Sequence, residues 1–121
     1  MVTKTKYHHG DLRKSLVSTA TDMVTEGGIE GLSFRKLAER IGVSRTAAYH
    51  HFTDKNDLLC AIAEQGFEQW HKRVSEIFSQ ENLSNENKYR NFVHAYIAFA
   101  TQNPSLYELM FGRVIWKENN S

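Results

Sequence analysis

A run of polar residues between Ser44 and Lys55 has the side chains that contacts with nucleic acid require. Arg45 can donate two hydrogen bonds to guanine O6 and N7, and Thr46 can offer its methyl group to thymine or its hydroxyl to a base or phosphate. The side chains better suited to phosphate oxygens are those of Tyr49, His50, His51 and Lys55. We therefore expect base readout from the first pair and most of the affinity from the second group.

Each of these residues also has an interpretation that needs no ligand. Arg45 would serve equally as a solvated surface charge, and Tyr49 as a core aromatic residue whose hydroxyl lies at the rim. His50 and His51 are neighbours that point about 100° apart on a helix, so they cannot chelate one metal ion from that face. No metal site is predicted.

The motifs of common enzyme classes are absent from the sequence. Gly27 and Gly28 follow a predicted helix and lead to no Gly-Lys-Ser sequence, so they form no phosphate-binding loop. The sequence contains neither a Gly-x-Ser-x-Gly elbow nor a His-Glu-x-x-His zinc helix. We predict that the protein is not an enzyme, has no catalytic residues and needs no cofactor.

The elements that must position the polar run are predicted to be short helices. A first helix over about 11–26 follows from the apolar residues that recur every four positions, which are Leu12, Leu16, Ala20 and Val24. Ser33 can cap a second helix over 34–41, and Ser44 can cap a third over 45–51. Glycines end the first two helices. Two short helices separated by about three residues are typical of a helix-turn-helix.

The rest of the chain is also predicted to be helical. Asp54 begins a long helix that ends near Gln80, and the polar segment 81–87 is predicted to be a loop and a boundary between two regions. A fifth helix follows and is ended by Pro104. A sixth, over about 105–116, has so little polar surface that it needs cover on more than one side, and no obvious segment remains to provide it.

Charge is concentrated in the front part of the sequence. The net charge of the whole chain is only +1, yet residues 1–14 and residues 35–55 each carry a net +3. From Leu58 onward six basic residues face seven acidic ones. Positive character in the region of the predicted helix-turn-helix favours double-stranded DNA as a partner.

Features of export and membrane insertion are missing from the sequence. The single cysteine, Cys60, excludes an intrachain disulfide and fits a reducing compartment. The residues before His9 are polar and basic with no apolar run behind them, and no stretch approaches the ~20 apolar residues of a membrane span. We expect a soluble, cytoplasmic protein without a membrane partner.

The motifs of residues 7–65 resemble the TetR/AcrR family of bacterial regulators. The matching runs are Tyr7-His8-His9-Gly10-Asp11-Leu12-Arg13, Gly31-Leu32-Ser33-Phe34-Arg35-Lys36-Leu37-Ala38, and Gly42-Val43-Ser44 through Ala48-Tyr49-His50-His51-Phe52 with Lys55, Leu58 and Leu59. The resemblance implies that helix 45–51 enters the major groove, that Tyr49 and Lys55 contact phosphates, and that Ser33 and His51 lie at the DNA beside Arg45 and Thr46.

These arguments together predict one set of DNA-contacting residues, an N-terminal arm and an all-α fold. The set is Ser33, Arg35, Ser44, Arg45, Thr46, Tyr49, His50, His51 and Lys55. A basic flexible arm over 1–9 would add Lys4, Lys6, Tyr7 and His8, or would be an inert tail. Residues 10–56 would form a three-helix helix-turn-helix domain. Residues 57–121 would supply a long linking helix and the first helices of an incomplete helical effector and dimerisation domain.

Residues 103–111 resemble the start of the effector domain in one branch of the family. The resemblance implies a repressor that binds a palindromic operator as a homodimer and responds to a small hydrophobic molecule. The residues predicted for its pocket are Trp70, Phe92, Tyr96, Tyr107 and Phe111, although ordinary core packing explains these aromatic residues better. Family members continue for several more helices. The chain is therefore either truncated or dimerises through exposed apolar faces of its fifth and sixth helices. The competing hypothesis is a protein-interaction module that pairs with a full-length regulator.

Overall fold

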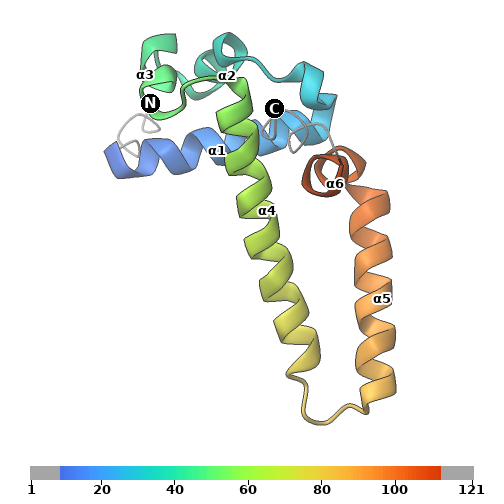
Figure 1. Ribbon diagram of the computed structural model, residues 1–121. Helices are drawn as coiled ribbons and strands as arrows, with labels where there is room; N and C mark the ends of the chain where they lie inside the picture. The colour runs from blue at the N-terminus through green and yellow to red at the C-terminus, as the bar shows by residue number, and fades with distance from the viewer. Residues whose placement is uncertain (1–8, 113–121) are drawn as a thin grey trace, which may run out of the picture.

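The computed structural model describes residues 9–112 and gives side-chain surroundings from residue 11 onward. This part of the chain is helical and contains no strand, which confirms the predicted all-α fold class. The elements in chain order are α1 (His9–Gly27), the 3-10 turn η2 (Ile29–Gly31), α2 (Phe34–Ile41), α3 (Arg45–His51), α4 (Lys55–Phe78), α5 (Asn85–Gln102) and α6 (Pro104–Phe111) (Figure 1).

Side chains just before four helices bind the free N–H groups of the first turn. Each accepts a hydrogen bond from the backbone N–H three residues later, and the four capping residues are Ser33, Ser44, Asp54 and Ser84. Gly28 and Gly42 follow α1 and α2 with positive φ of 76° and 93°, and Gly42 has the left-handed helical conformation. The bounds predicted for α2 and α3 are confirmed, because local signals mark both ends of α2 and the start of α3.

The other helices depart from their predicted bounds. α1 begins at His9, which was assigned to the arm, and α4 ends at Phe78 rather than near Gln80. α5 begins inside the predicted loop 81–87, because the cap at Ser84 lets the following polar residues form its first turn. Pro104 follows the end of α5 and is also the first residue of α6, where its missing N–H costs no helical hydrogen bond.

The end of α6 also differs from the prediction. The helix ends at Phe111, and Gly112 has extended backbone with φ of −80° and ψ of −177°. The residues 113–116 that the predicted helix included lie outside the described part of the chain.

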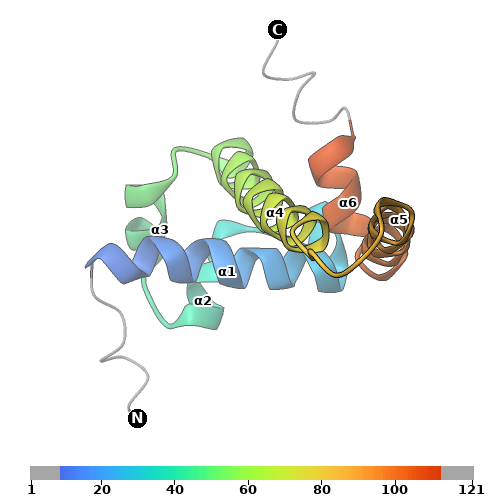
Figure 2. The ribbon, with the colours of Figure 1, turned by 90° about the horizontal axis from the view of Figure 1, so that it is seen from below.

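One continuous hydrophobic core joins α1, α2, α3, the first half of α4 and α6. Its largest fully buried side chains are Phe52, Leu16, Leu32, Leu37, Leu58, Ile62, Leu109, Met110 and Val24. Seen from below, α6 lies beside α1 and α4 (Figure 2). The expectation that no segment would cover α6 was wrong: α1 and α4 cover the face that carries Leu106, Leu109 and Met110. The proposed division of the chain after residue 56 stays a prediction.

α4 and α6 are in tight contact at Gly66, in the middle of α4. A Cβ atom on Gly66 would lie 2.6 Å from the sulfur of Met110, a buried residue of α6. Glycine weakens a helix interior by about 1 kcal/mol relative to alanine, so its presence here needs a packing reason. The missing side chain makes room for Met110 and brings α6 against the backbone of α4.

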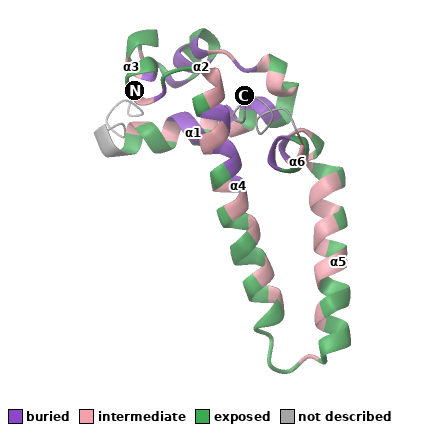
Figure 3. Ribbon diagram, viewed as in Figure 1, coloured by how far each residue is buried: buried purple, intermediate pink, exposed green. Residues whose placement is uncertain are grey.

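Beyond that contact α4 and α5 extend away from the core as an antiparallel pair joined by residues 79–84 (Figure 1). α5 contains no buried residue, and burial falls off along α4 after Gly66 (Figure 3). Several large apolar side chains of this pair are exposed, namely Tyr89, Ile97 and Phe78. Phe111 of α6, which contacts Tyr96 of α5, is also exposed. The apolar side predicted for the whole of α4 is therefore buried only in its first half.

Candidate nucleic-acid interface

The turn between α2 and α3 sets the direction of the predicted recognition helix. The left-handed backbone of Gly42 lets its N–H and that of Val43 both donate to the carbonyl oxygen of Ala38, at 2.8 and 3.0 Å. Ser44 then begins α3 through its hydrogen bond to the N–H of Ala47. The three residues 42–44 thus form the tight turn that connects α2 to α3 in a helix-turn-helix.

α3 is anchored by one face and exposes the other. Ala48 and the following Phe52 are fully buried in the core, with relative exposures of 0% and 1%. Arg45, Thr46 and His50 are exposed on the opposite side. Because the anchoring residues lie near the end of α3, its N-terminal residues project from the surface, as groove entry requires.

Tyr49 is packed on one side and exposed on the other. Its ring stacks on Phe34 with a centroid distance of 4.2 Å and an interplanar angle of 18°. Phe34 is buried in the core, whereas Tyr49 remains 49% exposed. The ring is held by packing across α2 and α3 while part of the side chain stays at the surface.

The two serines of the predicted set act first as helix caps. The hydroxyls of Ser33 and Ser44 each accept a backbone hydrogen bond of 3.1 Å, which leaves their own protons available for an acceptor outside the protein. Arg35 is exposed and lies 3.8 Å from Glu39. Lys55, the first residue of α4, is half-buried.

The two histidines at the end of α3 have different surroundings. His50 is exposed and His51 is half-buried, and their rings meet edge to face at 5.5 Å. Throughout the described part of the chain, no group of three or more His, Cys, Asp or Glu side chains could hold a metal ion.

Sequence reasoning missed Arg13 as a neighbour of α3. Its guanidinium lies 4.7 Å from the centre of the Phe52 ring, so a cation from α1 is held beside the end of α3. Lys36, in the first turn of α2, is a second exposed cation absent from the predicted set. Both residues stand in the runs that resemble the TetR/AcrR family and in the charge count of the front region, but neither signal showed that Arg13 would lie beside Phe52. Lys4, Lys6, Tyr7 and His8 of the predicted arm lie outside the described residues.

An ion pair ties the end of α1 to the end of α2. Arg40 donates from both terminal nitrogens to the two carboxylate oxygens of Glu26, each at 2.9 Å. This hydrogen bond lowers the pKa of Glu26 and raises that of Arg40, because each charged form stabilises the other. Arg40 is thereby paired with a carboxylate of the same chain, whereas Arg45 takes part in none of the ion pairs found among the described residues.

The five residues predicted for an effector pocket form one aromatic cluster. Trp70 of α4 contacts Phe92 and Tyr96 of α5 at ring distances of 6.0 Å, and Tyr107 of α6 contacts Tyr96 at 5.8 Å and Phe111 at 5.0 Å. The Tyr96 and Tyr107 hydroxyls share a hydrogen bond, which raises the pKa of Tyr107. The rings fill the space between three helices, and only Trp70 lines one of the hollows on that half of the molecule.

No helix in the part of the chain that the structure describes is both long and apolar enough to cross a bilayer.

Residues 16–62 match the model of the bacterial regulatory proteins of the tetR family. The chain is 35% identical over 86 residues to the tetracycline repressor protein class A from transposon 1721 of Escherichia coli, covering 68% of this chain and 40% of the relative. It is 29% identical over 108 residues to the nucleoid occlusion factor SlmA of Vibrio cholerae, covering 88% and 55%. The chain thus spans about half the length of these relatives.

A solved structure of a protein of unknown function from Rhodococcus sp. RHA1 has a similar fold. Its TM-score is 0.74 at 35% sequence identity, and the superposition covers 88% of this chain and 55% of that one. The matched part includes the α4–α5 pair as well as the core, because residues 16–62 alone are a smaller share of the chain.

Proposed function

Because residues 16–62 place the chain in the TetR family of bacterial regulatory proteins, we propose that it represses transcription by occupying a palindromic operator as a dimer. The observation that carries this proposal is the exposure of Arg45 and Thr46 at the front of α3, a helix anchored through Ala48. The tetracycline repressor among the relatives supports the choice of repression over activation.

In this proposal the residues of the interface divide the work between specificity and affinity. Arg45 donates to guanine and Thr46 contacts a neighbouring base in the major groove. The residues that contact phosphates and hold the helix in register are Ser33, Arg35, Ser44, Tyr49, His50, His51 and Lys55. Arg13 and Lys36 add positive charge at the edge of the same surface.

Control by a small molecule and a cytoplasmic location complete the proposed function. The effector would act on α4, α5 and α6, since these helices lie next to the DNA-binding core and α6 is packed into it. In the same proposal Lys4, Lys6, Tyr7 and His8 would add contacts to the DNA. No cofactor or catalytic residue enters the proposal.

The experiment that tests it selects binding sites from a random duplex pool with the purified chain. Enrichment of a palindrome with half-sites about one helical turn apart is the expected result. Arg45→Ala should weaken binding to that site by ~1 to 3 kcal/mol and relax the preference at one base pair. Arg90→Ala serves as the control, because Arg90 is an exposed cation on α5. An unchanged site preference in Arg45→Ala would remove Arg45 from base readout.

A second candidate function is a protein-interaction module that pairs with a full-length regulator. The observation in its favour is the exposure of Tyr89, Ile97, Phe78 and Phe111, at 63%, 52%, 43% and 44%. Such a module would tolerate Arg45→Ala, whereas a DNA-binding regulator would not. Retention of duplexes without enrichment of any sequence would favour this alternative.

A further inference from the structure

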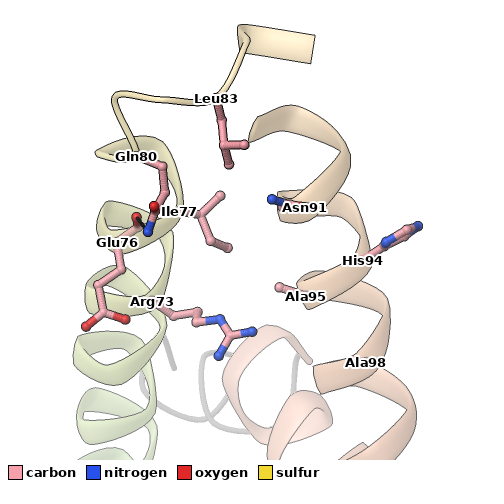
Figure 4. A pocket seen from close by; sticks show the side chains of 9 residues that line it. All are labelled: Arg73, Glu76, Ile77, Gln80, Leu83, Asn91, His94, Ala95 and Ala98. Carbon is pink, nitrogen blue, oxygen red and sulfur yellow. Dashed lines mark hydrogen bonds between the residues drawn. The ribbon is translucent and has the colours of Figure 1, made fainter. Parts of the chain in front are cut away.

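Two neighbouring hollows open along one side of the α4–α5 pair, and Arg73 lies where they meet. The first, shown in Figure 4, has a volume of about 660 Å³, and the second has a volume of about 400 Å³. Arg73, Ala95 and Ala98 line both, so the two form one groove. Volumes of a few hundred cubic ångströms are typical of small-molecule sites.

Arg73 is an exposed residue, and its guanidinium is the charged group that points across the first hollow. The guanidinium of Arg73 reaches from α4 toward α5, whereas Glu76 and His94 point away from the space between the helices (Figure 4). The three ion pairs found among the described residues involve other arginines, namely Arg35, Arg40 and Arg90. A planar guanidinium without a carboxylate partner suits a bidentate carboxylate ligand.

The walls of the groove are mixed: polar and apolar side chains alternate around the first hollow, whereas apolar ones dominate the second. Ile77 and Leu83 face the first hollow, and Asn91 offers an amide at the same end (Figure 4). On the other side of Arg73, the second hollow is lined by the rings of Trp70 and Phe99. An apolar body can therefore lie on either side of an anionic head held by the arginine.

We propose that this groove binds a small carboxylic acid with an apolar or aromatic body, its carboxylate on Arg73. The site is distinct from the aromatic cluster, whose rings pack on one another. The groove lies next to that cluster and shares only Trp70 with it.

The second hollow also reaches the contact between α4 and α6. Gly66 and Leu106 line it, and Leu106 belongs to the core that joins α6 to α1. A ligand there would change the packing of α6 against the helix that supports α2 and α3. This regulatory consequence rests on the proposed function, whereas binding of the acid does not.

The test uses hydrocinnamate as the probe and hydrocinnamyl alcohol as its neutral counterpart, with binding to the whole chain measured by titration calorimetry. Hydrocinnamate should bind the wild type more tightly than the alcohol does. Arg73→Gln should weaken hydrocinnamate binding about tenfold or more and leave the alcohol unchanged. Lys72→Gln is the matched control, because Lys72 is an exposed cation on the same helix that lines neither hollow.

A second variant tests the place of binding independently of charge. Ala98→Leu puts a larger side chain into both hollows and should weaken binding of the acid and of the alcohol together. Equal affinity of wild type and Arg73→Gln for hydrocinnamate, or no binding to the wild type, would overturn the proposal. Operator selection without the probe is a separate experiment, so failure of the groove and failure of DNA binding are distinguishable.

Discussion

The two halves of α4 lie in different surroundings. Its first half contributes Leu58, Ile62 and Gly66 to a core closed on several sides by α1, α3 and α6. Its second half packs mainly against α5, with one ring contact from Phe67 to Phe111 of α6, and no residue of α5 or of α4 after Gly66 is buried (Figure 3). Both halves carry an apolar stripe, so the difference comes from the number of elements packed around the helix rather than from the pattern along it.

This difference matters for the roles proposed for the two regions. The closed core holds α3 through Ala48 and Phe52, which keeps the predicted base-reading residues in a defined direction. The α4–α5 pair packs mainly through half-buried aromatic rings around Trp70 and leaves a groove beside them. The region proposed to bind DNA and the region proposed to bind a ligand are thus joined by one continuous helix, α4.

Matched truncations of phenylalanine should reveal the largest difference. Phe52→Ala removes a fully buried ring and should lower the free energy of unfolding by about 3 to 5 kcal/mol. Phe92→Ala removes the same atoms from a half-buried ring of α5 and should cost about 1 kcal/mol. Urea unfolding measures both costs. Equal costs would break the comparison, because they would show that α5 belongs to the same cooperative core.

Matched losses of a helix cap should give a smaller and more local difference. Ser44 and Ser84 are both exposed and each accepts a 3.1 Å hydrogen bond from a backbone N–H. Ser44→Ala should lower the free energy of global unfolding by about 1 kcal/mol. Ser84→Ala should instead speed hydrogen exchange in the first turn of α5 with little change in global stability, because that end is packed against few neighbours.

Amide hydrogen exchange and urea unfolding on the same samples separate these outcomes. Ser75→Ala is the control, since Ser75 is an exposed residue inside α4 that caps no helix. A global loss from Ser84→Ala as large as that from Ser44→Ala would place α5 within the cooperative unit.

Local signals were sufficient to predict the helices that carry the interface. Ser33 and Gly42 mark the two ends of α2, and Ser44 marks the start of α3. The cap at Ser84 was overlooked because it lies among other polar residues of a segment that resembles a loop. Prediction therefore succeeded where a cap adjoined an apolar helix and failed where it adjoined a polar first turn.

Contacts between distant parts of the chain could not be predicted in the same way. The cover of α6 comes from α1, about ninety residues earlier, and Arg13 meets Phe52 across two intervening helices. The five aromatic residues predicted for a ligand pocket lie together, but their periodicity could not show which side of the α4–α5 pair would stay open. The groove at Arg73 lies on the open side, so the sequence alone could not predict it.

Ion pairs should give the smallest difference between the two regions. Glu26 and Arg40 connect α1 and α2 through two 2.9 Å hydrogen bonds, whereas Arg90 and Glu86 lie 3.8 Å apart on α5 alone. All four side chains are well exposed, so solvent screens both pairs. Arg40→Gln should lower the thermal midpoint slightly near neutral pH, and Arg90→Gln should lower it less.

The pH dependence of the Arg40 effect has a definite sign. Folding lowers the pKa of Glu26 from its ordinary value of 4.5, so the pair stabilises the fold above that value. Its contribution is lost as the pH falls through the lowered pKa, because the carboxyl group then binds a proton in the folded state as well. The difference between wild type and Arg40→Gln should therefore vanish in acid and shrink in high salt. A difference that survived both conditions would mean that the aliphatic part of the Arg40 side chain stabilises the contact between α1 and α2 by packing. The closed core and the α4–α5 pair would then differ in apolar contacts and not in their ion pairs.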